Sequence, residues 1–304
     1  KRYGTSDCKM YSDIRQFLAE RPDIDAVLIA TGDRWHALAS IMAMRAGKDV
    51  FSEKPSSMTI AEGRMVVETA NRYRRVYQTG TQRLSEANFI FCIEMARSGR
   101  LGKIHTAYAH IAPWDAAEMR HDWLPAEPEP PKDEVDWDQW LGPCPWRPYN
   151  RTYVGGGWRG HYDFHTSCIG EWGAHTFAQA QMGIGAERTA AVVYHYVNNA
   201  TGDGMVTEFA NGVKMILSRG DKYWRGSCGM RFDGTEGWVS AADGYGKPEV
   251  SKPALLADFD KIVRDYVERT GHVMNHVRDF FNSVKSRRPT VANPEVMHYS
   301  MSTV

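Results

Sequence analysis

The first hundred residues alternate between short apolar runs and stretches whose hydrophobic residues recur at helical spacing. Because crossover helices bring successive strands side by side, this alternation predicts a parallel α/β sheet with buried, continuously apolar strands. Thr59 and Glu62 have the spacing of a capping box, which predicts the start of a helix. The predicted strands are 26–30, 50–52 and 76–79, and the predicted helices follow Ser12, span 35–46, follow Thr59 and include 89–96.

The hydrophobic pattern changes near Gly102, where strand-like runs begin to alternate between apolar and polar residues. Such alternation is typical of an antiparallel sheet with one exposed face. Asn211 and Gly212 predict a type I′ hairpin between two of these strands. We therefore predict a parallel-sheet domain at 1–102 and, at 103–304, an α/β domain with a large, open, mostly antiparallel sheet. Its predicted strands are 103–111, 190–196, 205–209, 213–218 and 238–239, and its predicted helices are 170–182, 258–270 and 276–284.

The composition narrows the range of partners. Basic and acidic residues number 37 each, which argues against nucleic acid or an anionic membrane as the main partner. No apolar run is long enough to span a bilayer, and the five scattered cysteines predict free thiols. Cytoplasmic and periplasmic locations both fit. Many of the 10 Trp and 14 Tyr lie between Trp114 and Trp172, where they predict either a sugar-binding surface or a small separate core.

A parallel sheet predicts ligand binding at the carboxyl ends of its strands, commonly of a nucleotide. The one literal G-x-G-x-x-G match is Gly155–Gly160, but no apolar strand precedes it and Trp158 and Arg159 would block a pyrophosphate. A first βαβ unit with its following strand needs roughly 50 more residues, so we expect the natural protein to extend before Lys1. Without that unit, the sheet would have an exposed apolar edge.

Four stretches resemble, in order, the signature motifs of the glucose–fructose oxidoreductase / inositol 2-dehydrogenase / rhizopine-catabolism (Gfo/Idh/MocA) oxidoreductases. The resemblance implies a partial Rossmann domain, NAD or NADP as cofactor, a sugar or polyol substrate, and a homo-oligomer, either a dimer or a tetramer. The chain departs from the family pattern in lacking the glycine-rich loop and the ribose-binding acid, and in having Glu171 where the family has Asp. The four stretches are Ala30–His36, Ala46–Val50 with Glu53-Lys54-Pro55, Gly80-Thr81-Gln82, and Gly170–His175.

Oxidising a sugar hydroxyl needs a hydride acceptor and a base for the hydroxyl proton. The resemblance implies that Lys54 and His175 transfer the proton, and Glu171, four residues before His175, is on the same helix face. For the residues of the aromatic stretch, loop packing is an equally good interpretation. The expected cofactor contacts are Thr31, Asp33, His36, Glu53, Lys54, Pro55 and Gln82, and the expected substrate contacts are Arg83, Tyr149, Trp158, Arg159, His161 and His165.

A metal site is an alternative to the expectation of no metal. His161, Asp163 and His165 would share one face of a strand, and Glu171 and His175 follow on a helix. Together they would support metal-assisted hydrolysis, elimination or isomerisation of a sugar. The sequence therefore leaves three functions open. These are a sugar or polyol dehydrogenase, a glycoside-cleaving or epimerising enzyme with transient keto-sugar or metal chemistry, and a non-catalytic carbohydrate-binding relative.

Overall fold

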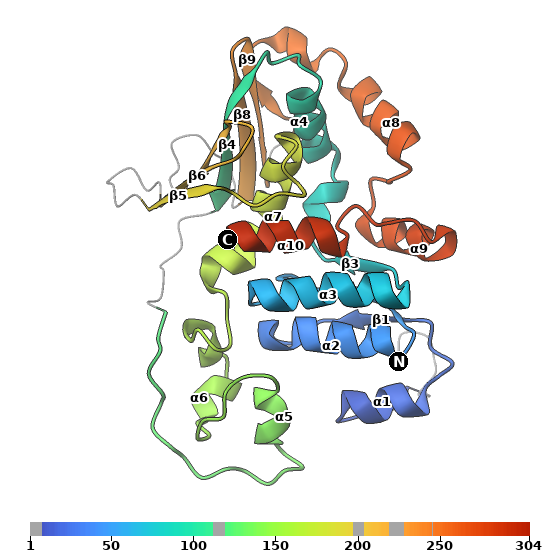
Figure 1. Ribbon diagram of the computed structural model, residues 1–304, viewed down its shortest axis with the longest axis vertical. Coiled ribbons are helices and arrows are strands. Elements are labelled where there is room, and N and C mark those ends of the chain that lie inside the picture. Colours follow the sequence, from blue (N-terminus) through green and yellow to red (C-terminus); the bar gives the residue numbers. More distant parts are fainter. Residues whose placement is uncertain (1–7, 112–118, 197–203, 219–227, 245) are drawn as a thin grey trace.

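The computed structural model describes residues 8–111, 119–196, 204–218, 228–244 and 246–304, and it contains two sheets (Figure 1). Sheet A is parallel and has the order β1-β2-β3. Sheet B has seven strands in the order β10-β9-β8-β4-β7-β6-β5, and its neighbours are antiparallel except for β4 and β7. The predicted fold class, a partial parallel sheet followed by a larger and mostly antiparallel one, is confirmed.

Sheet A consists of β1 (Ala26–Ile29), β2 (Asp49–Ser52) and β3 (Tyr77–Thr79), with α1 (Ile14–Glu20), α2 (Asp33–Arg45) and α3 (Ile60–Tyr73) between or before its strands. All four residues of β2 are buried, as predicted for a central parallel strand. The capping box of Thr59 and Glu62 is confirmed at the start of α3. The N-cap of α1 is Asp13 and not the predicted Ser12.

The prediction that residues 26–30 are buried on both faces is wrong for the described chain. Within it, β1 pairs with β2 alone, so β1 is the edge strand of sheet A. Ile29 is buried against α2, whereas the side chain of Leu28 is 68% exposed. An exposed apolar edge of this kind agrees with the expectation from the sequence.

Sheet B is formed by β4 (Ile104–Ile111), β5 (Val193–Tyr196), β6 (Met205–Glu208), β7 (Lys214–Ser218), β8 (Cys228–Gly234), β9 (Gly237–Ala242) and β10 (Glu249–Val250). The hairpin between β6 and β7 exists, but its turn is not type I′, because Gly212 has a positive φ of 82° and Asn211 does not. Gly212 N–H donates to the carbonyl of Phe209, as in a three-residue loop that ends in a left-handed residue.

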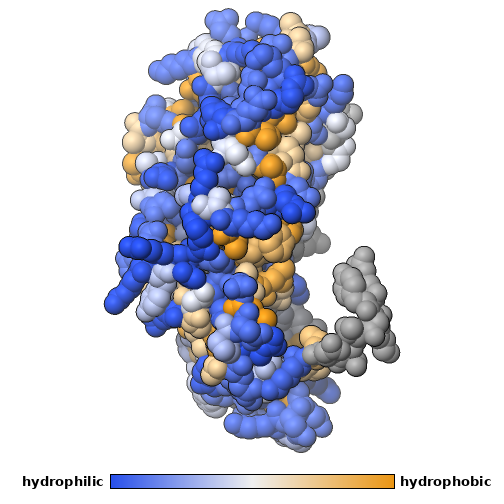
Figure 2. Space-filling model, turned by 90° about the vertical axis from the view of Figure 1, so that its right-hand side faces the viewer, coloured by the Kyte–Doolittle hydropathy of each residue, from blue (hydrophilic) through white to orange (hydrophobic). Residues whose placement is uncertain are grey.

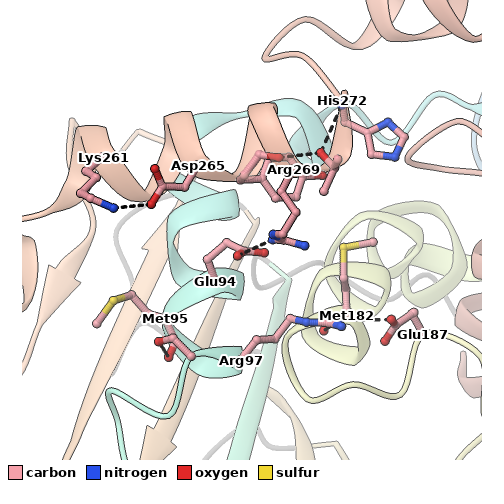
Figure 3. Close-up of polar contacts among 12 residues, drawn as sticks. Glu94, Met95, Arg97, Met182, Glu187, Lys261, Asp265, Arg269 and His272 are labelled. Atoms are coloured by element: carbon pink, nitrogen blue, oxygen red, sulfur yellow. Dashed lines mark hydrogen bonds and ion pairs between the residues drawn. The ribbon is translucent and has the colours of Figure 1, made fainter.

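The helices on sheet B are α4 (Ala87–Arg97), α7 (Ser167–Gly183) and α8 (Phe259–Thr270), and α4 and α7 share the main hydrophobic core with the sheet. Figure 3 shows the ion pairs that join these helices at the surface. Arg269 of α8 lies 2.6 Å from Glu94 of α4, and Arg97 of α4 lies 3.1 Å from Glu187 just after α7. The domain boundary at residue 102 stays a prediction, although α4 packs on the sheet B side.

The chain returns to sheet A through α9 (His276–Ser286) and α10 (Pro294–Thr303). His276, at the start of α9, hydrogen-bonds the carbonyl of Thr79 with Nε2 and the hydroxyl of Ser85 with Nδ1, at 2.7 and 2.9 Å. Helix α10 packs on α3 and α7 (Figure 1). The C-terminal helices therefore join the two sheets. No helix in the described residues has the length and apolar character needed to cross a bilayer.

Residues 120–166 form a separate lobe beside α2, with the short helices α5 (Trp137–Leu141) and α6 (Arg151–Val154) (Figure 1). Its interior, which we call the aromatic core, supports the interpretation of a small separate core for the buried residues of this stretch. The aromatic core consists of Trp137, Leu141, Tyr149, Tyr153 and Phe164.

Candidate functional site

The candidate site lies at the carboxyl ends of the three strands of sheet A. Thr31 follows β1, Lys54 follows β2 and Thr81 follows β3. Parallel strands bind their ligands at this edge, because the loops that follow the strands meet there. His36 of α2 ties two of the loops together: its Nδ1 lies 2.8 Å from the carbonyl oxygen of Pro55, and its Nε2 lies 3.0 Å from that of Thr31.

Lys54 is the first member of a polar network that crosses from sheet A to α7. Its Nζ lies 3.5 Å from Oε1 of Glu171, in the first turns of α7. The other carboxylate oxygen of Glu171 accepts a hydrogen bond of 3.1 Å from Nε2 of His165. The same nitrogen lies 3.9 Å from Oδ2 of Asp33, at the start of α2. Lys54, Glu171, His165 and Asp33 are hereafter called the polar network.

The charges in the polar network follow from its contacts. The hydrogen bond from His165 lowers the pKa of Glu171, and the Lys54 ammonium acts in the same direction against the effect of burial. Glu171 is therefore a carboxylate at neutral pH. Burial raises the pKa of Asp33, and the Glu171 carboxylate adds to this, while His165 and His36 oppose it.

His175 lies one helical turn after Glu171 on α7 and is buried. Its Nδ1 lies 3.0 Å from the hydroxyl oxygen of Thr81, which itself lies 3.5 Å from the carbonyl of Ala174. Burial lowers the pKa of His175 well below its ordinary value, and the positive charges of Arg83 and Lys54 have the same effect. The imidazole is therefore neutral at neutral pH and can accept a proton.

The side of the polar network that faces solvent is lined by aromatic and cationic side chains. The ring of Trp172 lies 5.7 Å from Nζ of Lys54, and Trp158 packs edge-on against His165 with ring centroids 5.5 Å apart. Arg159 is exposed, lies over the ring of Trp158 at 4.5 Å, and its charge acts on Glu171. Of the six expected substrate contacts, Trp158, Arg159 and His165 therefore lie at the site.

The remaining expected site residues differ in their surroundings. Arg83 forms an ion pair with Asp243, so its guanidinium is already engaged. Gln82 is exposed at the end of β3. Glu53 lies against the backbone of Gly80, where an added Cβ would come within 2.7 Å of Oε2 of Glu53.

Tyr149 and His161, two further expected substrate contacts, lie in or against the aromatic core. Tyr149 packs edge-on against Trp137 at 5.3 Å, and His161 packs against Tyr153 at 4.9 Å. Both side chains are less than 10% exposed, at 8% and 3%. Their surroundings support the packing interpretation, although their roles in binding stay predictions.

The structure gives no support to the alternative of a five-residue metal site. The strand expected at 161–165 is absent: the N–H groups of Phe164 and His165 both bond back to the carbonyl of His161, as in a helical turn. Asp163 pairs with Arg147, which turns it away from Glu171. Among the described residues, no group of three or more His, Cys, Asp or Glu side chains is arranged to hold a metal ion.

The aromatic core positions His165 by docking onto the start of α2. The indole N–H of Trp35 donates to the carbonyl of Gln139, and Nε of Arg34 donates to that of Trp140. The Arg34 guanidinium also lies 3.7 Å from the Trp140 ring centroid, a cation–π contact. Since α2 also carries Asp33, this docking brings His165 to the polar network.

The sequence interpretation missed three contributors: Trp172, Thr81 as the partner of His175, and Asp243 as the partner of Arg83. Trp172 follows Glu171 directly and Thr81 belongs to one of the family motifs, so both could have been predicted from the sequence. Asp243 is 160 residues from Arg83, and no local pattern indicates such a contact.

The strand-end loops fit one part of a dinucleotide. Oδ2 of Asp33 is buried and has no hydrogen-bond donor, so a ligand hydroxyl or amide group would satisfy it. The loops of Thr31 and Lys54 are already held in place by His36. The described residues contain no glycine-rich turn between a strand and a helix, since Gly155–Gly160 runs from the end of α6 through a 3₁₀ turn. The residues present therefore fit the nicotinamide side and not the pyrophosphate.

Comparison with protein families decides the classification. Residues 3–81 match the Gfo/Idh/MocA oxidoreductase family, NAD-binding Rossmann fold, and residues 112–304 match its C-terminal alpha/beta domain. The chain belongs to this family. The resemblance drawn from the four sequence motifs is thereby confirmed. The family is one of NAD-binding oxidoreductases, and the structures similar to this chain include sugar dehydrogenases.

Individual relatives extend the comparison. The chain is 32% identical over 124 residues to a glycosyl hydrolase family 109 protein of Shewanella sp. (strain W3-18-1), which is 38% of this chain and 25% of the relative. It is 32% identical over 111 residues to an alpha-N-acetylgalactosaminidase of Shewanella oneidensis, which is 34% of this chain and 23% of the relative. The matched stretches thus span about a quarter of these curated relatives.

Solved structures share the fold at low sequence identity. The WlbA dehydrogenase from Bordetella pertussis, solved in complex with NADH and UDP-GlcNAcA, has a TM-score of 0.62 at 14% identity. The similarity covers 95% of this chain and 77% of WlbA. At this identity the comparison shows the fold alone.

Proposed function

We propose that this chain supplies the catalytic residues of an NAD(P)-dependent oxidoreductase that moves a hydride to or from a hydroxyl-bearing carbon of a sugar or polyol. The ion pair of Lys54 with Glu171, at the ligand-binding edge of sheet A, carries the proposal. A buried, neutral His175 lies one helical turn from Glu171. Family membership supports the cofactor, and the sugar dehydrogenases among the similar structures support the substrate class.

The roles follow from the contacts. Oxidation of a secondary alcohol sends a hydride to an acceptor and the hydroxyl proton to a base. A nicotinamide bound at this edge would supply the hydride acceptor. Lys54 binds the substrate hydroxyl and takes part in the transfer of the hydroxyl proton, while Glu171 fixes the position of the Lys54 ammonium group. His175 accepts the proton transiently at its other ring nitrogen, since Thr81 holds its Nδ1 side; it passes the proton on, because burial disfavours the charged ring.

The walls of the site support a carbohydrate substrate. Trp158 lies against His165 and Trp172 lies near Lys54, so both rings border the polar network. Sugars present C–H patches between their hydroxyl groups, so an aromatic face and nearby charged groups suit them together. The exposed Arg159 adds hydrogen-bond donors at the same rim.

A second candidate, cleavage of a glycosidic bond through a transient keto sugar, is favoured by the relatives named glycosyl hydrolase family 109 protein. The same proton-transfer groups would serve it, because oxidation at one carbon acidifies the neighbouring C–H. The cofactor would then be regenerated within each turnover. The two candidates therefore differ in their products and in whether reduced cofactor accumulates.

One experiment tests both candidates. The natural protein is incubated with NAD or NADP and a panel of free sugars, polyols and aryl glycosides, and reduced cofactor and released aglycone are measured together. The first candidate predicts reduced cofactor in proportion to oxidised sugar. The second predicts aglycone release that depends on the cofactor without its net reduction. Neither product on any substrate, from a protein that retains its dinucleotide, would reject both candidates.

A further inference from the structure

A second cleft lies at the amino ends of the strands of sheet A, the edge opposite Lys54. It has a volume of about 760 Å³ and lies between the turn from α3 to β3, the link from α9 to α10, and the segment after α7. Figure 2 looks onto the side of the molecule where α9 and the start of α10 lie, and strongly hydrophilic side chains gather there at mid-height. The charged residues that line the cleft are Arg74, Arg75, Arg188, Arg287, Arg288 and Glu295.

The cleft is strongly basic in a protein without net charge. Five arginines face a single glutamate, whereas the whole chain has 37 basic and 37 acidic residues. Glu295 also lies 3.9 Å from Arg64, which is outside the lining, and it forms no ion pair with an arginine of the cleft among the described residues. A local excess of positive charge in a concave site attracts anions.

Two of the arginines hold the walls of the cleft in place. Arg287 makes a bidentate ion pair with Asp49 at the start of β2, with N–O distances of 2.6 and 3.0 Å, and it donates to the carbonyl of Arg74. Arg75 donates to the carbonyls of Tyr73 and Gly47, at 2.9 and 2.8 Å. These contacts fix the geometry of the cleft before any ligand binds.

Three arginines of the lining, Arg74, Arg188 and Arg288, are exposed and have no acidic partner among the described residues. Two of them, Arg74 and Arg188, come from separate elements, the end of α3 and the segment after α7, and both line the cleft. Guanidinium groups bind phosphate and sulfate oxygens through paired N–H donors. A cleft of this volume also lies in the range of small-molecule sites.

We propose that this cleft binds a small anion that carries two or more phosphate or sulfate groups. The anion bridges Arg74 and Arg188 and thereby joins the turn after α3 to the segment after α7. The site is separate from the polar network, because Lys54 is at the carboxyl edge of sheet A and the cleft is at the amino edge. Its occupant therefore does not depend on the proposed oxidoreductase activity.

Isothermal titration calorimetry at low salt tests the proposal, with inorganic pyrophosphate in one arm and a doubly sulfated disaccharide in the other. The arm with the tighter binding identifies the source of the anion. The double variant Arg74→Asn with Arg188→Gln is expected to weaken binding by about tenfold or more, since two donor pairs are lost. Asn is chosen at position 74 because the residue has a left-handed backbone, with φ of 52°, which Asn tolerates.

The matched control is Arg72→Gln, which removes an exposed arginine near the end of α3 that does not line the cleft. Its affinity for either anion is expected to stay within about twofold of the wild-type value, since salt screens the effect of a charge outside the cleft. Melting temperatures of the free variants establish that they fold. The proposal is overturned by a wild type that binds neither anion at millimolar concentration, or by a control that loses as much affinity as a folded double variant.

Discussion

The polar network and the aromatic core use the same kinds of side chain for different purposes. The polar network contains a histidine, carboxylates and a cation, and a histidine, a carboxylate and a cation also lie in or beside the aromatic core. His165 hydrogen-bonds Glu171, which pairs with Lys54, whereas His161 packs on Tyr153 beside Arg147 and Asp163. Both histidines are 3% exposed, so burial does not distinguish them.

The difference lies in what surrounds the charges. In the polar network, Lys54 and Glu171 have side chains 20% and 19% exposed, and Oδ2 of Asp33 lacks a donor, so a ligand can complete the arrangement. In the aromatic core, Arg147 is enclosed by aromatic rings and paired with Asp163. The charged groups of the polar network are partly exposed and so can reach a ligand, whereas the Arg147 side chain is 1% exposed and enclosed by the protein.

The largest expected effect comes from Lys54→Met. The substitution keeps the length of the side chain and removes the proton-transfer group, so the rate of sugar-dependent cofactor reduction should fall by about a thousandfold. The free energy of unfolding should change by less than about 1 kcal/mol, since the ion pair with Glu171 is partly exposed. Initial rates and urea denaturation measure the two quantities.

The matched control is Lys261→Met on α8, where the lysine is exposed and pairs with Asp265. It should keep the wild-type rate. A Lys54→Met protein with wild-type turnover would remove Lys54 from catalysis and leave the polar network as a structural feature.

The next effect separates the two histidines directly. His165→Asn should lower the rate by about tenfold. It should also shift the acid limb of the pH–rate profile to higher pH, because the hydrogen bond that lowers the pKa of Glu171 is lost. His161→Asn should leave the rate per folded molecule within about twofold and cost about 1 kcal/mol of stability through lost packing.

Initial rates over a pH series and urea denaturation of both variants check this pair of expectations. The comparison fails if His161→Asn shifts the pH–rate profile as much as His165→Asn does. It also fails if His165→Asn merely destabilises the protein without a shift of the profile.

The sequence predicted sheet A well because its strands are short, apolar and separated by capped helices. It missed β8, although apolar residues alternate there with Gly229, Arg231 and Asp233 as in a half-exposed strand, and it missed α10, although Asn293 and Pro294 are a typical helix start. It also predicted β1 to be fully buried, because an apolar strand has the same hydrophobic pattern whether or not a neighbouring strand covers it.

The candidate site was predictable only in part. The family motifs singled out Lys54, Glu171 and His175, and the structure brings Lys54 and Glu171 within 3.5 Å. The spacing of residues 161, 163 and 165 predicted one strand face, whereas the chain forms a turn that sends His161 and His165 to different neighbours. Which histidine joins the site depends on the docking of the aromatic core onto α2, and a local pattern does not contain that information.

The smallest expected effect is a pH dependence of stability that arises from His175. Burial lowers its pKa in the folded protein, and in the unfolded chain it returns to the ordinary value of about 6.5. Below that pH the unfolded state binds a proton that the folded state does not, so the free energy of unfolding falls on acidification and is fully retained above it. His276, buried at the start of α9, contributes in the same direction.

Urea denaturation at several pH values between about 7.5 and 5.5 measures this dependence, in a window above the titration of ordinary carboxylates. Replacing His175 by Gln should reduce the slope by up to about 1.4 kcal/mol per pH unit, the limit for one proton. His105→Gln, at an exposed position of β4, is the control and should leave the slope unchanged. An unchanged slope in His175→Gln would mean that folding does not lower the pKa of His175, which would contradict its assignment as a buried, neutral imidazole.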